Sequence, residues 1–263
     1  MREYPKEFTI DSVKKFHVAL VDFIRETMEK KGFEKVVLGL SGGADSTLGA
    51  FLAVEALGPE NVTGIRMPYK SSSPESLEHA ALAADKLKID TMTIEITPMV
   101  DAYFVRFPDA NQVRRGNKMA RERMSILYDQ AHKSNALVLG TSNKTEVMLG
   151  YGTIFGDAAS AFNPLGAIYK TEVWMMGELL GIPEVIVEKE PSADLWKGQT
   201  DEDELGIDYL TADRILYNMI ENGSADKDIE ALGIPAEKIV AVHELIDASG
   251  FKRRLPDVPV VER

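Results

Sequence analysis

Apolar residues recur along the first part of the chain with two different periods. Between residues 10 and 31 they return every three to four positions, which is the spacing of one helix face, and Gly32 suits the end of that helix. Residues 35–40, KVVLGL, form a short continuous run that is rich in β-branched side chains and predicts a buried strand. Three further short apolar runs predict strands at 62–67, 91–96 and 136–140.

Helical patterns separate these predicted strands. We expect helices over 47–57, over 74–87 with Pro74 in the first turn, and over about 117–133. Strands that alternate with helices indicate a parallel sheet covered on both faces, so the expected fold class is α/β with a doubly wound parallel sheet. We place this core at about 33–185.

The remainder of the chain has weaker patterns. Residues 190–206 hold Pro, Gly and an acidic run without a period, and we expect a mobile lid there. Short helical patterns with breaks at Gly223 and 233–235 predict that 207–263 forms a small helical annex and a tail. Because no linker marks a second domain, we expect residues 1–263 to form a single domain.

Composition narrows the function. The 263 residues carry 30 Lys and Arg against 42 Asp and Glu, and the net charge of −12 argues against partners such as nucleic acid or an anionic membrane. No apolar run approaches the ~18 residues of a membrane span, and the first residues lack the apolar core of a signal peptide, so we expect a cytoplasmic protein. The absence of cysteine rules out disulfides, thiolate metal sites and cysteine nucleophiles. With four His, the expected metal is Mg2+ on oxygen ligands.

The segment after the first predicted strand, SGGADS, predicts a phosphate-binding loop. A strand that enters a Gly-rich turn and then a helix aims backbone N–H groups and the positive helix end at one point. We expect Gly42 and Gly43 to let a phosphate approach closely, and Ser41 and Ser46 to donate hydrogen bonds. Asp45 is unfavourable in an anion site unless a cation bridges it to the phosphates, and Mg2+ is the natural bridge.

Other interpretations of this turn stay open at the level of the residues. It can serve helix packing alone. It also fits the G-x-S-x-G nucleophile elbow of a hydrolase, with Ser41 as nucleophile and His243 as base, although this leaves Asp45 and Ser46 without a role. A Walker A loop is excluded because the chain contains no Gly-Lys dipeptide.

The SGGADS turn looks like the SGGxDS loop of the N-type ATP pyrophosphatases, and further segments resemble the ammonia-dependent NAD+ synthetases. These segments are GNKMARERM at 116–124, GTSNKTE at 140–146, GD at 156–157, YKT at 169–171 and PSADLWKGQTDE at 191–202. The resemblance covers nearly the whole chain. It implies a homodimer in which ATP adenylates the carboxylate of deamido-NAD+ and ammonia displaces AMP. Because the chain lacks the cysteine of a glutaminase, we expect free ammonia as the nitrogen source.

The resemblance implies that the ATP side of the site is complete. Asp45 and Glu146 are expected to hold Mg2+, while Asp45, Lys170 and Asp157 are the expected catalytic residues. Lys170 would offset charge that develops on the phosphate. The expected ATP-binding residues are Gly39, Leu40, Ser41, Gly42, Gly43, Ala44, Asp45, Ser46, Thr141, Lys170 and Ser192.

Residues 114–123 carry five cations and predict a local anion patch in this acidic chain. Arg121 and Arg123 are two positions apart and cannot share a helix face, so one is expected to reach a ligand while the other pairs structurally. The expected acceptor-binding residues are Arg121, Arg123, Asp157 and Lys252.

Three positions depart from the family pattern on the acceptor side. Ile154 stands where the family has Lys, Ala161 where it has Asp, and Phe251 where it has His. Each hydrogen bond removed by such a change is worth roughly 1–3 kcal/mol. Two explanations follow: a divergent NAD+ synthetase that holds deamido-NAD+ with other residues, or a relative that adenylates and amidates a different, less polar carboxylate. A non-catalytic ATP-binding module is a third alternative.

Overall fold

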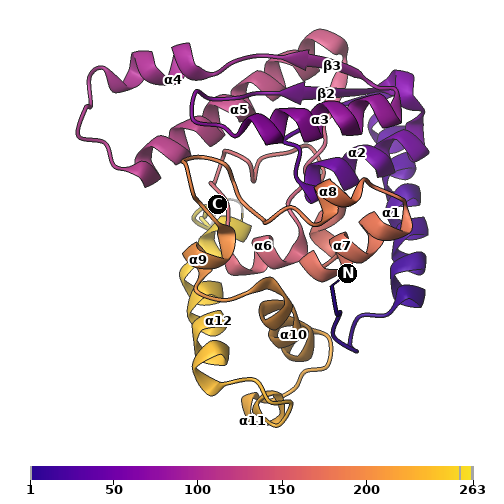
Figure 1. Ribbon diagram of the computed structural model, residues 1–263, viewed down its shortest axis with the longest axis vertical. Helices are drawn as coiled ribbons and strands as arrows, with labels where there is room; N and C mark the ends of the chain where they lie inside the picture. The colour runs from indigo at the N-terminus through magenta and orange to yellow at the C-terminus, as the bar shows by residue number, and fades with distance from the viewer. Residues whose placement is uncertain (1, 255, 262–263) are drawn as a thin grey trace.

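The computed structural model describes residues 2–254 and 256–261, and within them a four-stranded parallel sheet forms the centre of the molecule (Figure 1). The strands are β1 (Lys35–Gly39), β2 (Val62–Arg66), β3 (Asp90–Thr93) and β4 (Ala136–Val138), in the order β3-β2-β1-β4. Strand β1 pairs with both β2 and β4 and is therefore central. Because the chain reverses its direction of winding at β1, the loops after β1 and β4 meet at one edge of the sheet.

Helices cover both faces of this sheet, which confirms the α/β, doubly wound prediction. Val36 and Leu38 of β1 join one apolar core, and Val37 between them joins the other. The first core packs against α1 (Ile10–Lys31), α2 (Ala44–Leu57) and α3 (Pro74–Leu87), and the second against α4 (Thr97–Phe104) and α5 (Gln112–Ser134). No helix in the described part of the chain is both long and apolar enough to cross a membrane.

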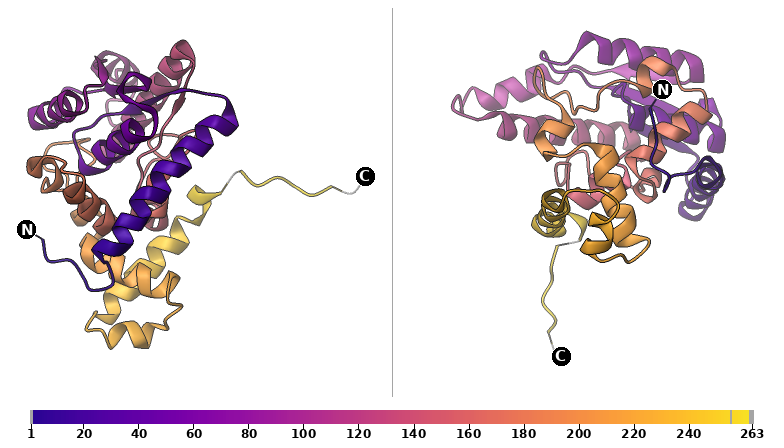
Figure 2. Two further views of the ribbon diagram at one scale, coloured as in Figure 1. Left: turned by 90° about the vertical axis from the view of Figure 1, so that its right-hand side faces the viewer. Right: turned by 60° about the horizontal axis from the view of Figure 1, so that its bottom comes forward.

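A smaller group of helices lies below the sheet layer in the view of Figure 1 and confirms the expected helical C-terminal part (Figure 2). It consists of α10 (Tyr209–Ile220), α11 (Asp226–Glu230) and α12 (Ala236–Ala248). Helix α10 packs against α6 (Lys144–Leu149) and α7 (Lys170–Leu179), and α12 also contacts α6. The annex therefore touches the core through two helices that begin at the carboxyl edge of the sheet.

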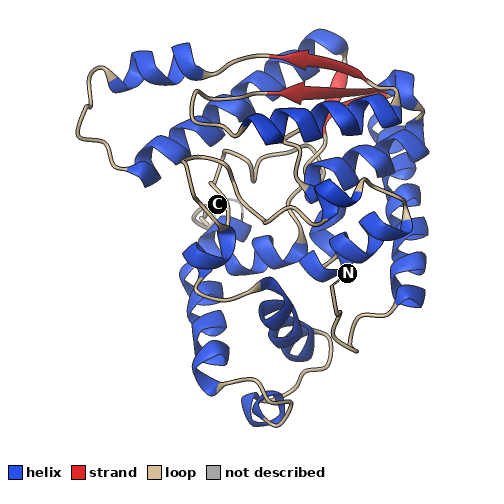
Figure 3. Ribbon diagram, viewed as in Figure 1, coloured by secondary structure: helices blue, strands red, loops and turns tan. Residues whose placement is uncertain are grey.

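The structure has more helix than the sequence pattern predicts, and helices predominate over strands in Figure 3. Helix α5 begins at Gln112 rather than near 117, because the Asn111 side chain caps it by accepting from the Arg114 N–H at 3.0 Å. Within the expected lid, Thr200 caps α9 by accepting from the Asp203 N–H at 3.2 Å. The shorter elements are α8 (Glu184–Val187), α9 (Asp201–Leu205) and the 3-10 helices η1 (Pro59–Asn61), η2 (Pro164–Ala167) and η3 (Gly250–Arg253).

Candidate active site

A cavity of about 430 Å³ opens at the carboxyl edge of the sheet, between β1, β2, β4 and the segment at 189–204. Leu40, Met67 and Leu139 line it directly after three of the strands. This is the crevice where open α/β sheets bind ligands, and the volume lies in the range of small-molecule sites. The predicted site residues that line it are Gly39, Leu40, Ser41, Gly43, Ala44, Asp45, Ser46, Arg123, Thr141, Glu146, Asp157, Lys170 and Ser192.

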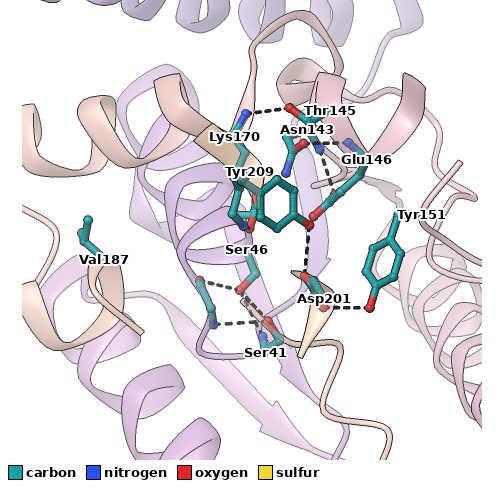
Figure 4. Close-up of polar contacts among 12 residues, drawn as sticks. Ser41, Ser46, Asn143, Thr145, Glu146, Tyr151, Lys170, Val187, Asp201 and Tyr209 are labelled. Atoms are coloured by element: carbon teal, nitrogen blue, oxygen red, sulfur yellow. Dashed lines mark hydrogen bonds and ion pairs between the residues drawn. The ribbon is translucent and has the colours of Figure 1, made fainter. Parts of the chain in front are cut away.

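The phosphate loop after β1 is closed by hydrogen bonds between its two serines (Figure 4). The Ser41 N–H donates to the Ser46 hydroxyl oxygen at 3.2 Å, and the two hydroxyls lie 2.9 Å apart. The Ser41 hydroxyl also accepts from the Gly43 N–H at 3.3 Å. Helix α2 begins at Ala44 beside this turn, so its free N–H groups and positive end face the cavity.

Gly42 was expected to let a phosphate approach closely, but the structure gives another reason for glycine at this position. Its φ is +81°, and a Cβ at this position would lie 2.1 Å from the carbonyl oxygen of Ser76 at the start of α3. Gly42 is also not among the described residues that line the cavity. The position therefore lets α3 pack against the loop, while Gly43 faces the cavity.

Asp45 is held by an amide and by an ammonium group. Its Oδ1 accepts from the Asn143 amide at 2.8 Å, and its Oδ2 pairs with the Nζ of Lys170. Lys170 is the first residue of α7, and only 3% of its surface is exposed. A buried ammonium group is stable only beside carboxylates, so this contact fixes the Lys170 ammonium directly beside the loop.

Glu146 lies in the first turn of α6, where it forms a capping box with Asn143. The Glu146 carboxylate accepts from the Asn143 N–H at 3.1 Å, and the Asn143 side-chain oxygen accepts from the Glu146 N–H at 2.9 Å. Asn143 therefore orients both carboxylates, since its amide nitrogen binds Asp45.

Charge and burial shift the proton affinities of these groups. Burial, and then the like charge of Asp45, raise the pKa of Glu146 well above its ordinary value. Burial lowers the pKa of Lys170, but Asp45 and Glu146 outweigh it, so the pKa of Lys170 is raised and the side chain stays an ammonium. The Lys170 ammonium is thus the cation for both Asp45 and Glu146, and because it pairs directly with Asp45, the charge of Glu146 is only partly balanced.

The described residues contain no group of three or more His, Cys, Asp or Glu side chains arranged to hold a metal. Asp45 and Glu146 provide two carboxylates beside a phosphate loop. Mg2+ is commonly bound by one or two carboxylates together with substrate phosphates rather than by a complete protein cage. The oxygen donors, and the raised pKa of the partly buried Glu146 beside Asp45, therefore fit a Mg2+ ion that is completed by a nucleotide.

A third carboxylate, Asp201, lies at the same cavity and was not expected as a site residue. It accepts from the Tyr151 hydroxyl at 2.8 Å and from the Tyr209 hydroxyl at 3.1 Å (Figure 4). Burial raises its pKa, and Lys170 opposes that effect. The sequence signal for this position is the cap Thr200 before an acidic turn, which is too short to show a helical period.

The segment at 190–206 covers the cavity and is anchored to α3. Both oxygens of Asp194 accept from the Ser73 N–H, at 3.1 and 3.0 Å, and one accepts from the Ser76 hydroxyl at 3.1 Å. Ser192 donates to the carbonyl oxygen of Gln199 at 2.7 Å, and Trp196 lines the cavity. The segment is thus placed where it can exclude water.

The structure separates the two arginines of the expected patch. Arg123 lines the cavity and donates to the carbonyl oxygen of Met67 at 3.0 Å. Arg121 is exposed and donates to the carbonyl oxygen of Ile154 at 3.3 Å. Of the five cations at 114–123, only Arg123 is among the described residues lining the cavity, so the patch does not converge there.

Asp157 and Lys252 lie on either side of one loop. Asp157 lines the cavity and accepts from the Thr153 N–H at 2.9 Å. Lys252 donates to the carbonyl oxygens of Gly150 and Gly152 at 2.7 and 2.9 Å. Lys252 therefore ties η3 to the loop that presents Asp157.

The three apolar departures lie outside the main cavity. Ile154, Ala161 and Phe251 are not among the described residues that line the 430 Å³ cavity. Ala161 lines a second hollow of about 250 Å³ together with Tyr128 and His132, while Phe251 is 62% exposed. The departures therefore leave the phosphate loop and its carboxylates unaltered.

The doubly wound fold, the loop after β1 and the Asp45–Lys170 pair define a nucleotide-binding α/β protein that has no Walker A loop. A family model described as NAD synthase matches residues 16–256, and the chain belongs to this family. An NH(3)-dependent NAD(+) synthetase from Fusobacterium nucleatum is 52% identical over 96% of this chain and 98% of its own length. A relative of the same description from Trichlorobacter lovleyi is 53% identical over 92% and 89%.

Solved structures agree with this assignment. An NH3-dependent NAD synthetase from Campylobacter jejuni superposes with a TM-score of 0.80 at 33% identity, covering 94% of this chain and 99% of that one. A structure described as NMN synthetase from Francisella tularensis has a TM-score of 0.84 at 32% identity, covering 96% and 99%.

Proposed function

We propose that this protein is an ATP-dependent, AMP-forming ligase that converts deamido-NAD+ and ammonia to NAD+. The observation that carries the proposal is the buried Lys170, which is paired with Asp45 directly beside the phosphate loop. Membership of the NAD synthase family and the names of the similar proteins support the same reaction.

In the first step the acceptor carboxylate attacks the α-phosphorus of ATP. A bond forms between the carboxylate oxygen and phosphorus, and the bond to the leaving pyrophosphate breaks. The loop from Ser41 to Ser46 receives the pyrophosphate, and the Lys170 ammonium offsets the charge that develops on the phosphate oxygens. Mg2+, held by Asp45 and Glu146, would supply further charge neutralisation.

In the second step ammonia attacks the acyl carbon of the acyl-adenylate. The carbon–nitrogen bond forms, and AMP leaves with the electron pair of the carbon–oxygen bond. We assign to Asp157 the proton that the attacking ammonia sheds, because its carboxylate lines the same cavity.

We propose that residues 190–206 act as a mobile lid and that 207–263 form an annex to a single domain. An acyl-adenylate is hydrolysed when water reaches it, so a cover over the cavity is needed. The contact of Asp194 with Ser73 supports this proposal, because it attaches the segment to α3 beside the cavity.

A different carboxylate is the second candidate for the acceptor. Ile154, Ala161 and Phe251 remove polar groups from positions where the family binds a charged dinucleotide, and the structurally similar Francisella tularensis protein is described as an NMN synthetase. Comparing kcat/KM for deamido-NAD+ and nicotinate mononucleotide tests this candidate. If kcat/KM is higher for nicotinate mononucleotide, that compound replaces deamido-NAD+ as the assigned acceptor.

We further propose a cytoplasmic homodimer that uses small-molecule substrates and binds neither nucleic acid nor membranes. ATP is a cytoplasmic co-substrate, and the arm formed by α4 and α5 exposes apolar side chains such as Tyr103, Val105 and Val113 that a second copy would cover. Light scattering after size-exclusion chromatography tests the dimer, and a monomeric mass contradicts it.

The reaction itself is tested by incubating the protein with deamido-NAD+, ATP, Mg2+ and ammonium. We expect NAD+ and AMP in equal amounts, and neither product without ammonium beyond slow AMP release. If the protein binds ATP but forms no AMP with any carboxylate tested, it is a non-catalytic ATP-binding module. Labelling of Ser41 by a fluorophosphonate would show the hydrolase.

A further inference from the structure

A buried carboxylate outside the cavity joins the two helices that carry Glu146 and Lys170. Asp213 lies on α10 of the annex with none of its surface exposed. Its Oδ1 accepts a hydrogen bond from the Thr145 hydroxyl, and its Oδ2 accepts from the Thr171 N–H at 2.7 Å. One side chain thus holds the first turns of α6 and α7 together.

The network continues to Lys170 itself. The Thr145 hydroxyl oxygen accepts from the Lys170 N–H at 3.0 Å (Figure 4) and at the same time donates to Asp213. Thr145 directly precedes Glu146, and Thr171 directly follows Lys170. Each residue bound by Asp213 is therefore the immediate neighbour of a residue that faces the cavity.

A second carboxylate on the same helix repeats this arrangement. Glu221, at the end of α10, pairs with the Lys144 ammonium and accepts from the Tyr169 hydroxyl at 2.9 Å. Lys144 begins α6, and Tyr169 caps α7. Helix α10 thus binds both helix starts twice, once at a buried position and once at a more exposed one.

The contacts of Asp213 are electrostatically favourable because they lie at the N-termini of α6 and α7. A carboxylate that binds free N–H groups at a helix N-terminus interacts with the positive helix end. Burying Asp213 without these partners would be costly, so its position and those of Thr145 and Thr171 determine one another. A displacement of about 1 Å between reacting groups can cost about 100-fold in rate.

We propose that Asp213 is a positioning residue for the ligase reaction, which sets the placement of Glu146 relative to Lys170 through Thr145 and Thr171. The inference rests on the proposed function, because that function assigns Mg2+ binding to Glu146 and contact with an ATP phosphate to Lys170. It also gives the annex a role in the reaction. Asp213 is not among the described residues that line the cavity, so it acts on substrates through its neighbours.

Replacing Thr145 tests the network without removing any group that faces the substrates. Thr145→Val keeps the shape of the side chain and removes the hydroxyl, which leaves the Lys170 N–H and Asp213 Oδ1 without their partner. We expect kcat to fall about 10- to 100-fold while KM for deamido-NAD+ changes less than about threefold. Thr145→Ser restores the hydroxyl and is expected to stay within about threefold of the unmodified protein.

Thr47→Val is the matched control. Thr47 is equally buried, lies in the first turn of α2 beside Ser46, and its hydroxyl has no hydrogen-bond partner in the described part of the chain. We expect kcat of this variant to stay within about twofold. If Thr145→Val lowers the melting temperature but keeps kcat per folded molecule, or if Thr47→Val loses as much kcat, the positioning role is overturned.

A readout without turnover separates this inference from the proposed function. Mn2+ affinity in the presence of α,β-methylene-ATP, measured by electron paramagnetic resonance, depends on Glu146 but not on the acceptor. We expect Thr145→Val, and Asp213→Asn as a second variant should Thr145→Val not fold, to weaken Mn2+ binding about five- to tenfold. Unchanged Mn2+ affinity overturns the inference. If the variants lose Mn2+ affinity but the unmodified protein makes no NAD+, the positioning role stands, and only deamido-NAD+ as the acceptor is rejected.

Discussion

At the scale of single residues, the site depends on one buried ammonium group that lies between two partly buried carboxylates. Lys170 pairs with Asp45, and Asn143 binds both Asp45 and Glu146. We propose two purposes for Lys170: to stabilise the acidic pair in the nucleotide-free protein, and to offset phosphate charge in the reaction. These purposes can be separated by substitution.

Lys170→Met is expected to lower the rate of AMP formation by about 100- to 1,000-fold, because the charge that stabilises the transition state is lost. The same variant leaves Asp45 and Glu146 without their resident cation, so it is expected to bind Mn2+ more tightly than the unmodified protein in the absence of nucleotide. Electron paramagnetic resonance measures the second effect, and Lys170→Arg is the control that keeps the charge. Weaker Mn2+ binding by Lys170→Met would argue against the shared-cation description.

Residue roles were only partly predictable from the sequence. The serines and Asp45 could be placed at the cavity because their motif is local, and a strand followed by a Gly-rich turn dictates their geometry. Glu146, in the first turn of α6, could be placed there only through the family resemblance. Asp213 could not, because an Asp within an amphipathic helix is expected on its solvent face, and only the tertiary contact with Thr145 shows otherwise.

At the scale of elements, periodicity predicted the long helices and all four strands. Helices α6 and α9 have six and five residues and are too short to show a period. Their caps were the usable signal: Asn143 with Glu146 three residues later, and Thr200 before an acidic first turn. The attachment of the lid to α3 could not be predicted, because Asp194 and Ser73 are 121 positions apart.

Loosening the lid is expected to raise KM for the nucleotide and to increase AMP release without amide formation. Asp194→Asn removes the charge that binds the α3 N-terminus. Trp196 in the lid and Trp174 in α7 are the two tryptophans of the chain, so Trp174→Phe leaves Trp196 fluorescence as a direct reporter of closure. We expect a weaker ATP-dependent fluorescence change in Asp194→Asn.

Asp203→Asn removes a charge of the same sign from the same segment at an exposed position and serves as the control. Equal fluorescence changes in Asp194→Asn and Asp203→Asn would show that the contact with Ser73 does not hold the lid.

At the scale of the whole molecule, the net charge is −12, and acidic side chains also outnumber basic ones in the cavity. Seven acidic side chains but four basic ones are found among the described residues that line it. A free ATP anion would meet unfavourable charge there. We therefore expect ATP to bind at least about tenfold more weakly in EDTA than with Mg2+, as isothermal titration calorimetry would measure. Equal affinities would contradict the assignment of Asp45 and Glu146 to the metal.

Buried carboxyl groups also make stability depend on pH. Burial raises the pKa of Glu172 to about 7 and that of Asp213 to about 6. A carboxyl whose pKa is raised in the folded state binds more protons there than in the unfolded chain. Its contribution is therefore fully present below pH ~4, and stability is lost as pH rises towards about 7.

Glu172→Gln keeps the oxygen that accepts from the Tyr169 N–H and removes the ionisation. We expect this variant to match the unmodified protein at pH 5 and to be more stable by about 1–3 kcal/mol at pH 8, measured by urea unfolding. Glu184→Gln, at an exposed position, is expected to change neither value. A gain at pH 5 as large as that at pH 8 would exclude ionisation of Glu172 as the cause.

The central claim is that the acceptor carboxylate attacks the α-phosphorus of ATP before ammonia enters. Deamido-NAD+ labelled with 18O in its carboxylate tests this directly, because the attacking oxygen stays on phosphorus when AMP leaves. We predict that mass spectrometry finds one 18O atom in the AMP and one fewer in the nicotinamide product. AMP without 18O, or 18O in pyrophosphate, would contradict the account.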